Sequence, residues 1–417
     1  MRLLAAIAVT AIVLAPQAAR AERIVLKAGR LLDPESGTVS ANRTIVVEGG
    51  RIKEVGGAAA ANGARVIDLS DATVLPGLFD CHTHLCANVP VRARTVDEML
   101  RDVMTYASQV PTAFRALQGA AAAASMLDSG FTTVRDLGNA GLYADTALRQ
   151  AVEQGLVPGP TIVNAGRIIA PFGGQFHVPA DRPGLGVPEY IYADTRDEIR
   201  KAVRENVHFG AKVIKLVVDD QPYIYSADDI RAAVDEAGRA GLKVAAHCVT
   251  EPGARNAIEG GVASIEHGTA MPDALLALAR ERKVVLVGTD FTPDLLGRMG
   301  MSGLYPTMVD RLRRAQRIGT PMAFGSDVFI DVPGQSRGAL AASLVHTAIE
   351  AGIAPRLLLQ MMTVNAARLL GVDGERGRIA PGLAADLIAV RGNPLENAAA
   401  LQDVVFVMKD GRVVKGR

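Results

Sequence analysis

Short apolar runs alternate with helix-like stretches through the middle of this 417-residue chain. The intervening segments have helical periodicity, as in 226–241, where Ser226 is a suitable N-cap and Asp229 stands in the first turn. Strands that alternate with helices predict a parallel sheet, and eight such units predict an α/β protein with a (β/α)8 TIM-type barrel over 76–379. The eight runs are 77–84, 132–137, 161–166, 213–218, 243–248, 264–268, 283–289 and 322–327.

The two ends of the chain have a different pattern, with β-type runs separated by tight-turn signals. Gly49-Gly50 and Asp410-Gly411 each stand between two such runs and predict hairpins. We predict that residues 22–75 and 380–417 together build one small β-sandwich domain. The segment 86–129 interrupts the alternation between the first two barrel strands, and we expect it to be mostly helical and to cover part of the barrel mouth.

The first 21 residues have the pattern of a secretory signal peptide. Arg2 gives a positive start, residues 3–15 form a short apolar core, and Ala19-Arg20-Ala21 is a small-x-small cleavage site. The apolar run is short for a membrane span, although an uncleaved anchor or a buried helix remains open. Cleavage before Glu22 predicts an exported protein, in the bacterial periplasm or secreted, with no membrane span after cleavage.

Composition and charge disfavour several classes of partner. The presumed leader carries two arginines and no acid, so its removal changes the net charge from +1 to about −1. That balance gives no basic footprint for nucleic acid. Tryptophan is absent and aromatic residues make up 4%, which argues against a base-stacking surface or an aromatic carbohydrate cleft. Cys81 and Cys248 are expected to pack as small core residues on their strands.

Two histidines one residue apart, His82 and His84, end the first barrel run. Side chains two residues apart on a strand point to the same face, so both imidazoles could reach one metal ion. Two solvated loop histidines are the alternative for this motif alone. Active sites of such barrels lie at the carboxyl ends of the strands. Metal-ligand residue types recur there, at the ends of the fourth, fifth, sixth and eighth runs: Lys215, His247, His267 and Asp327.

Each of these later residues has an ordinary interpretation alone, since a histidine is commonly satisfied in a core and an aspartate commonly caps a helix. Lys215 lies inside an apolar run, where an uncompensated ammonium carries a large desolvation cost. It could pair with Asp219 or Asp220. Alternatively, reaction with carbon dioxide would make it a carbamate whose two oxygens bridge two metal ions. If none of these residues bound metal, five strand ends would each have to carry a metal-ligand residue type by coincidence.

The chain resembles the amidohydrolase superfamily, and within it the imidazolonepropionase-related and prolidase-like peptidases. The resemblance covers nearly all of the mature chain. It rests on the motifs LPGLFDCHTHL, VIKL, GLKVAAHC, GGVASIEHGT, MAFGSD, MMTVNAARLLG and RGRIAPGLAADLIAV. Related enzymes mostly remove a C-terminal residue from dipeptides or N-acyl amino acids, and some hydrolyse ochratoxin at its phenylalanine amide. Oligomers are common among them, so a homo-oligomer is expected by resemblance only.

The resemblance implies a binuclear metal centre built from six residues. The more buried ion is expected on His82, His84 and Asp327, the more exposed ion on His247 and His267, with carboxylated Lys215 bridging both. Zinc is the expected metal because imidazole and carboxylate suit it, and these residue types also fit manganese or cobalt. Asp327 is the expected catalytic residue, which would take a proton from the attacking water and deliver it to the leaving amine.

The loops that follow the strands supply candidates for substrate binding. His177 could bind a carboxylate or a carbonyl, Tyr223 or Tyr225 could reach the site, and Arg337 could clamp a carboxylate through both guanidinium nitrogens. His177 could also be a loop histidine, either tyrosine could lie away from the site, and Arg337 could be a surface arginine. We expect a small-molecule or short-peptide substrate from which a C-terminal amino acid is released.

Three other functions remain open at this stage. A mononuclear deaminase or cyclic amidohydrolase would lack the bridging lysine, so Lys215 argues against it. A hydrolase of a lactone, carbamate or phosphotriester is compatible with the same ligands. A catalytically inactive binding protein on this fold would be expected to have lost ligands, whereas all six positions are filled.

Overall fold

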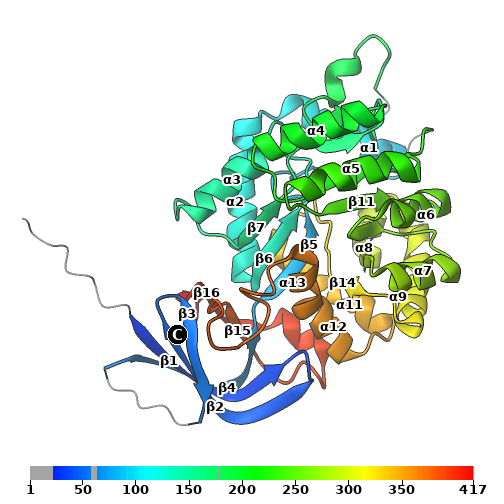
Figure 1. The fold of residues 1–417 in the computed structure, drawn as a ribbon. Helices are drawn as coiled ribbons and strands as arrows, with labels where there is room; N and C mark the ends of the chain where they lie inside the picture. The colour runs from blue at the N-terminus through cyan, green and yellow to red at the C-terminus, as the bar shows by residue number, and fades with distance from the viewer. Residues whose placement is uncertain (1–21, 58–62, 92, 177, 221, 417) are drawn as a thin grey trace, which may run out of the picture.

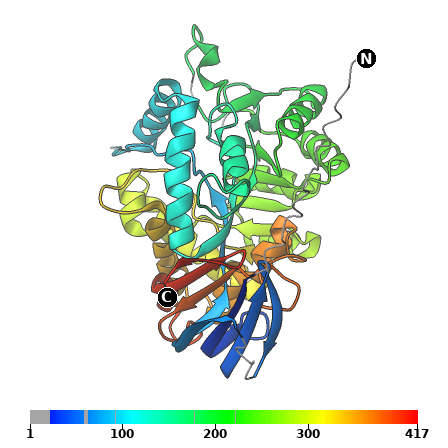
Figure 2. The same cartoon turned by 90° about the vertical axis from the view of Figure 1, so that its left-hand side faces the viewer.

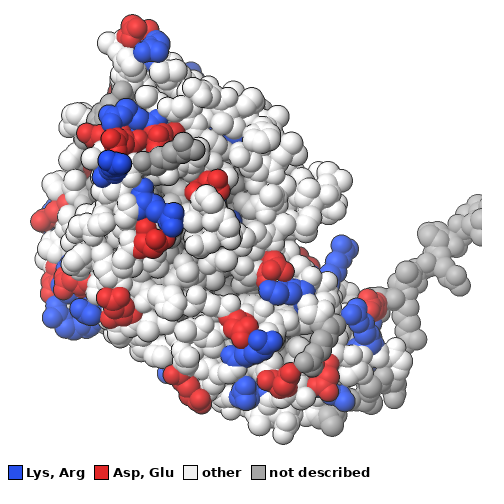
Figure 3. All heavy atoms as spheres, turned by 180° about the vertical axis from the view of Figure 1, so that it is seen from behind, with Lys and Arg blue, Asp and Glu red and all other residues white. Residues whose placement is uncertain are grey.

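The computed structural model describes residues 22–57, 63–91, 93–176, 178–220 and 222–416. The predicted signal peptide, residues 1–21, lies outside the described residues. No helix in these ranges is long and apolar enough to cross a membrane. On the face in Figure 3, acidic and basic side chains are interspersed rather than gathered by sign.

Eight parallel strands form the barrel. They are β5 (Leu78–Thr83), β6 (Phe131–Asp136), β7 (Thr161–Asn164), β10 (Ile214–Val217), β11 (Val244–Cys248), β12 (Ser264–His267), β13 (Val285–Val287) and β14 (Met322–Ala323). Seven fall within predicted runs, and the other, β6, begins one residue before its run. The barrel strands belong to two hydrogen-bonded sheets, β5 to β7 and β10 to β14. Backbone hydrogen bonds join the two sheets at both edges and so close the barrel, from Cys81 N to Phe324 O at 2.8 Å and from Lys212 N to Asn164 O at 2.7 Å. The strands are buried almost throughout, on both faces, although β5, β6 and β12 also carry polar and charged residues.

Helices cover the outside of this barrel (Figure 1). The predicted cap of α5 is confirmed, because the Ser226 hydroxyl accepts from the Asp229 amide while the Asp229 carboxylate accepts from the Ser226 amide. The main helices are α2 (Thr112–Asp128), α3 (Ala144–Glu153), α4 (Arg196–His208), α5 (Ala227–Arg239), α6 (Glu251–Gly260), α7 (Asp273–Arg282), α9 (Tyr305–Ile318), α10 (Arg337–Ser343), α11 (Val345–Glu350), α12 (Pro355–Met361) and α13 (Val364–Leu370).

Three insertions extend the barrel mouth. The segment 86–129 is mostly helical, as predicted: α1 (Val96–Gln109) lies at the mouth, while the long α2 packs against α3 and α10 (Figure 2). Two short strands that the sequence did not suggest, β8 (Ile168–Ala170) and β9 (Tyr190–Tyr192), continue the sheet beyond β10. The segment between β13 and β14 contributes α8 (Pro293–Arg298) and η2 (Ser302–Leu304).

Both ends of the chain meet in a second sheet of seven strands. β15 pairs antiparallel with β4, which joins the C-terminal hairpin to the N-terminal strands (Figures 1 and 2). The predicted turns at 49–50 and 410–411 connect β2 to β3 and β16 to β17. The sheet encloses a core of its own that includes Leu26, Ile45 and Phe406. Its strands are β1 (Arg23–Asp33), β2 (Thr38–Glu48), β3 (Arg51–Gly56), β4 (Arg65–Pro76), β15 (Leu387–Val390), β16 (Val404–Lys409) and β17 (Arg412–Lys415).

Candidate active site

A cavity of about 350 Å³ opens at the carboxyl ends of the barrel strands. Its size is within the usual range for small-molecule sites. All six residues expected to hold metal line it: His82, His84, Lys215, His247, His267 and Asp327. The alternation of side chains along β5 brings the first two to the same side of their strand, as predicted from the HTH spacing.

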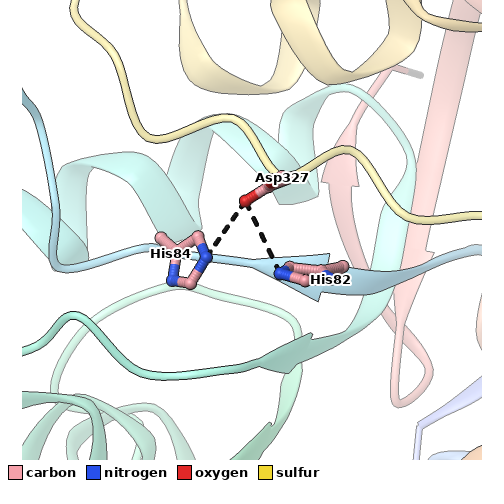
Figure 4. A group of neighbouring side chains, drawn as sticks. All are labelled: His82, His84 and Asp327. Carbon is pink, nitrogen blue, oxygen red and sulfur yellow. Dashed lines mark ion pairs between the residues drawn. The ribbon is translucent and has the colours of Figure 1, made fainter. Parts of the chain in front are cut away.

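His82, His84 and Asp327 form a buried cluster, which we call the inner ligand group (Figure 4). One ligand atom from each lies within 4.8 Å of the other two. The Asp327 Oδ1 oxygen is 3.0 Å from His84 Nε2 and 3.5 Å from His82 Nε2. Two imidazole nitrogens that converge on one carboxylate oxygen are a donor set suited to a divalent cation.

The far nitrogen of each inner histidine is already engaged. His84 Nδ1 lies 2.8 Å from the carbonyl oxygen of Gly138, and His82 Nδ1 lies 2.8 Å from Glu266 Oε2. Each acceptor favours a proton on Nδ1, which leaves Nε2 as the nitrogen that a metal ion beside Asp327 would take. Arg135 donates to the other Glu266 oxygen at 2.8 Å, so that carboxylate bridges an arginine and a histidine in the barrel interior.

Lys215, His247 and His267 face this cluster from β10, β11 and β12, and we call them the outer ligand group. The His247 and His267 rings are 4.4 Å apart between centroids, and His267 Nδ1 is 3.8 Å from Asp327 Oδ2. His247 Nε2 is buried and has no hydrogen-bond partner among the described residues. The Asp220 carboxylate lies 3.5 Å from it, too far for a good hydrogen bond. A metal ion bound here would satisfy this buried nitrogen.

The site shifts the pKa values of its histidines in different directions. Although burial opposes protonation, the hydrogen bond and the charge of Asp327 raise the pKa of His84. Burial lowers the pKa of both His82 and His267 well below the usual value, which favours the neutral imidazole that a metal requires. Burial also lowers the pKa of Lys215 to about 8. Although burial opposes ionisation of Asp327, His82 and His84 hold its pKa below the usual value, so the carboxylate is charged.

The backbone around the cavity is strained. Of the nine described non-glycine residues with positive φ, five line this cavity: Asn139 (53°), Asp220 (83°), His267 (67°), Thr289 (51°) and Asp327 (53°). Non-glycine residues in this region of φ cost free energy and persist where the surrounding structure enforces them, commonly at functional sites. Their concentration here is therefore independent support for assigning function to this cavity.

Arg337 is neither an exposed surface arginine nor part of the cavity lining, so this structure does not place it as a carboxylate clamp. The Arg337 guanidinium is buried and donates to backbone carbonyl oxygens, including that of His84 at 3.0 Å and that of Ala87 at 2.6 Å, and also to Val328 O. These bonds tie the loop after β5 to the loop after β14. Because its donors are used beneath the site and the side chain does not line the cavity, Arg337 supports the ligand loops instead.

The tyrosine candidates also lie away from the cavity lining. Tyr225 is 1% exposed and its hydroxyl donates to the carbonyl oxygen of Ala193, so it belongs to the hydrophobic core and does not reach the cavity. Tyr223 is 54% exposed on the surface. His177 lies outside the described residues. Cys81 and Cys248 are buried and free, which confirms their expected packing role, and Cys86 is also a buried free thiol.

Several lining residues were not anticipated from the sequence. Gln175 donates to Asp220 at 3.0 Å and accepts from the Tyr190 hydroxyl at 3.1 Å, which forms a polar edge beside His247. Neither segment carries a motif that would reveal this contact. Arg135 and Glu266 lie in the barrel interior and not in the lining, and the sequence did carry a signal for them. Each is a charged residue inside an apolar run, which is the argument that drew attention to Lys215.

A closed parallel barrel with histidine, lysine and aspartate side chains converging at its carboxyl end defines a TIM-barrel protein with an enzyme-type site. Residues 73–416 match the model of the Amidohydrolase family, and the chain belongs to that family. It is therefore a hydrolase. The predicted superfamily and the predicted barrel with a second domain are both confirmed.

Individual relatives agree with this assignment. Ochratoxinase from Aspergillus niger is 28% identical over 385 residues, which cover 82% of this chain and 76% of that protein. A solved Xaa-Pro dipeptidase with bound methionine in its active site is 29% identical, with a TM-score of 0.81 over 95% of this chain and 100% of that chain. A prolidase solved with N-methylphosphonate-L-proline is 30% identical, with a TM-score of 0.82 and the same coverage.

Proposed function

We propose that this protein is a metal-dependent amide hydrolase that releases a C-terminal amino acid from dipeptides or N-acyl and N-aroyl amino acids. The observation that carries the proposal is the convergence of the six ligand-type side chains on one cavity, with the inner ligand group within 4.8 Å. The names of the relatives support the substrate class, because ochratoxinase and the two dipeptidase-type structures are similar over most of the chain.

The residues present fit two divalent cations, most naturally zinc. The inner ligand group would hold one ion, His247 and His267 would hold the other, and Lys215 would serve both as a carbamate. When bound, such a pair polarises the scissile carbonyl and makes water a stronger nucleophile near neutral pH. The fit rests on the fixed Nδ1 partners of the inner histidines and on the unsatisfied His247 Nε2.

The chain's own residues have separate tasks in this proposal. Asp327 is ionised and borders both ligand groups, so it is placed to accept the proton of the attacking water and return it to the leaving amine. An amide requires that second transfer because an unprotonated amine leaves poorly. The Lys215 amine, with its pKa lowered to about 8, is partly neutral near pH 7 and can attack carbon dioxide, losing a proton to form the carbamate.

One experiment tests the class directly. Residues 22–417 are purified, metal is counted per chain, and dipeptides, N-acyl amino acids and ochratoxin are incubated with the protein and analysed by mass spectrometry. Two zinc ions per chain with release of a C-terminal amino acid is the expected result. Two ions without amide cleavage would move the assignment to lactones, carbamates or phosphotriesters. A single ion would make Lys215 an ordinary lysine and favour a deaminase or cyclic amidohydrolase.

The cellular location is a separate proposal that rests on residues 1–21 of the sequence. We propose that they direct export and are removed before Glu22. Mass spectrometry of the mature N-terminus from the native source tests this, and an intact Met1 would contradict it.

A further inference from the structure

One side of the cavity is apolar and is built by two insertions. Helix α1 contributes four of its residues, and the segment between β13 and β14 contributes five, none of them charged. We call these residues the apolar wall: Val96, Met99, Leu100, Val103, Phe291, Met299, Met301, Leu304 and Met308. The ligand groups with Gln175 and Asp220 make up half of the remaining lining, and the other half includes Ile168, Phe176, Tyr190, Val249 and Phe329.

Gly300 joins the two insertions into one surface. A Cβ atom on Gly300 would lie 2.5 Å from the backbone nitrogen of Thr95, the N-cap of α1, so only glycine permits this approach. Its φ of +71° is also in the region that favours glycine. The backbone after α8 therefore rests directly on the start of α1, and the wall is continuous across the two segments.

The chemistry of the wall indicates what it would bind. Four of its nine residues are methionines, whose flexible and polarisable side chains adapt to irregular apolar groups. Among the described residues that line the cavity, Lys215 is the one lysine or arginine, and it belongs to the outer ligand group. A charged group placed on the wall would lose water without gaining an ionic partner there.

We propose that the substrate carries a bulky, uncharged apolar substituent that packs against this wall, and that α1 and residues 291–308 select for it. This inference rests on the proposed function for its location in an amide substrate. The substituent belongs either to the acyl group or to the side chain of the released amino acid. Each methylene buried there is expected to tighten binding about fourfold, so short polar substrates are poor ones.

Binding of the two product classes tests the wall without requiring turnover. Isothermal titration of the zinc-loaded protein compares octanoate with acetate for the acyl side, and L-phenylalanine with glycine for the amine side. We expect at least tenfold tighter binding of the larger member in one pair, and that pair identifies the side. Equal affinities within both pairs would overturn the inference.

Two matched variants on α1 locate the effect. Leu100 and Met104 are both half-buried, but Leu100 lines the cavity and Met104 does not. Leu100→Gln should reduce the preference for the larger product at least threefold, whereas Met104→Gln should leave it unchanged. Equal losses in the two variants would contradict the proposal. If no amide is cleaved while the Leu100-dependent preference persists, the proposed function fails and the apolar site stands.

Discussion

The inner and outer ligand groups occupy the same cavity, but the chain supports them differently. Both inner histidines have an acceptor on Nδ1, and Asp80 accepts from the backbone amides of His82 at 3.1 Å and Ser326 at 2.9 Å, which joins β5 to the end of β14. In the outer group, His267 Nδ1 contacts Thr289 Oγ1 at 2.8 Å, while His247 Nε2 has no hydrogen bond among the described residues.

This difference separates two ways of building one site. The inner group is held by hydrogen bonds from the barrel interior, so its geometry belongs to the fold itself. The outer group combines a buried lysine and an unsatisfied imidazole, both of which cost free energy in the protein alone. We therefore expect the inner site to bind its ion more tightly, and the outer group to depend on the second ion and the carbamate.

Substitution of Asp327, which borders both groups, is the most severe way to break this arrangement. Asp327→Asn keeps the size of the side chain but removes the charge that draws cations and the base that moves protons. Turnover should fall by about 10³-fold or more. Steady-state kinetics on a cleaved amide measures it, with Asp331→Asn, an exposed aspartate four residues later, as the control. Wild-type rates in the Asp327 variant would remove this residue from the mechanism.

Substitution of Glu266, which contacts His82 from the barrel interior, should weaken metal binding by the inner group. Glu266→Gln removes the side-chain oxygen pair shared by His82 and Arg135 and leaves the Arg135 guanidinium without its buried partner, which should lower the free energy of unfolding by about 3–5 kcal/mol. Because the His82 imidazole is then no longer held in place, the affinity of the inner group for its ion should also fall by about 10–100-fold. Urea unfolding and chelator competition measure the two effects.

A double variant separates positioning from stability. Adding Arg135→Met to Glu266→Gln removes the stranded charge and should recover stability without recovering metal affinity. Recovery of both, or a single Glu266→Gln variant that binds zinc as tightly as wild type, would contradict a positioning role for Glu266.

Burial of Lys215 in the outer group should make the free energy of unfolding depend on pH. Burial lowers the pKa of Lys215 in the folded, metal-free protein to about 8, against 10.5 in the unfolded chain. Between these values the unfolded state binds the extra proton, so the free energy of unfolding should rise with pH by about 3 kcal/mol through this window. Lys215→Met should lack that rise, and Lys212→Met, at an exposed lysine, should retain it. Parallel pH profiles for all three proteins would contradict the prediction.

The sequence predicted the barrel well because each strand is a short apolar run buried on both faces, and a ligand residue at a strand end is carried to the mouth by the fold alone. The positions of His82, His84 and Asp327 at strand ends were therefore enough to predict that they meet at the mouth. Loop residues are placed by contacts that no local pattern encodes: Arg337 turned out to bond backbone carbonyls beneath the site, and Tyr225 packs against Ala193. Strands β8 and β9 are only three residues each, too short for periodicity to reveal.

The smallest expected effect comes from Thr289, which supplies the hydrogen bond that orients His267 within the outer group. Thr289→Val keeps the shape and the β-branching at this strained position but removes the hydroxyl, and the loss of one hydrogen bond is worth about 1 kcal/mol. The outer ion should therefore bind about fivefold more weakly, with the inner ion unaffected, in a stepwise zinc titration of the metal-free protein. Thr289→Ser retains the hydroxyl and should bind both ions as wild type does. If Thr289→Ser weakens binding of the outer ion while Thr289→Val does not, the methyl packing of Thr289 orients His267, and the hydrogen bond does not.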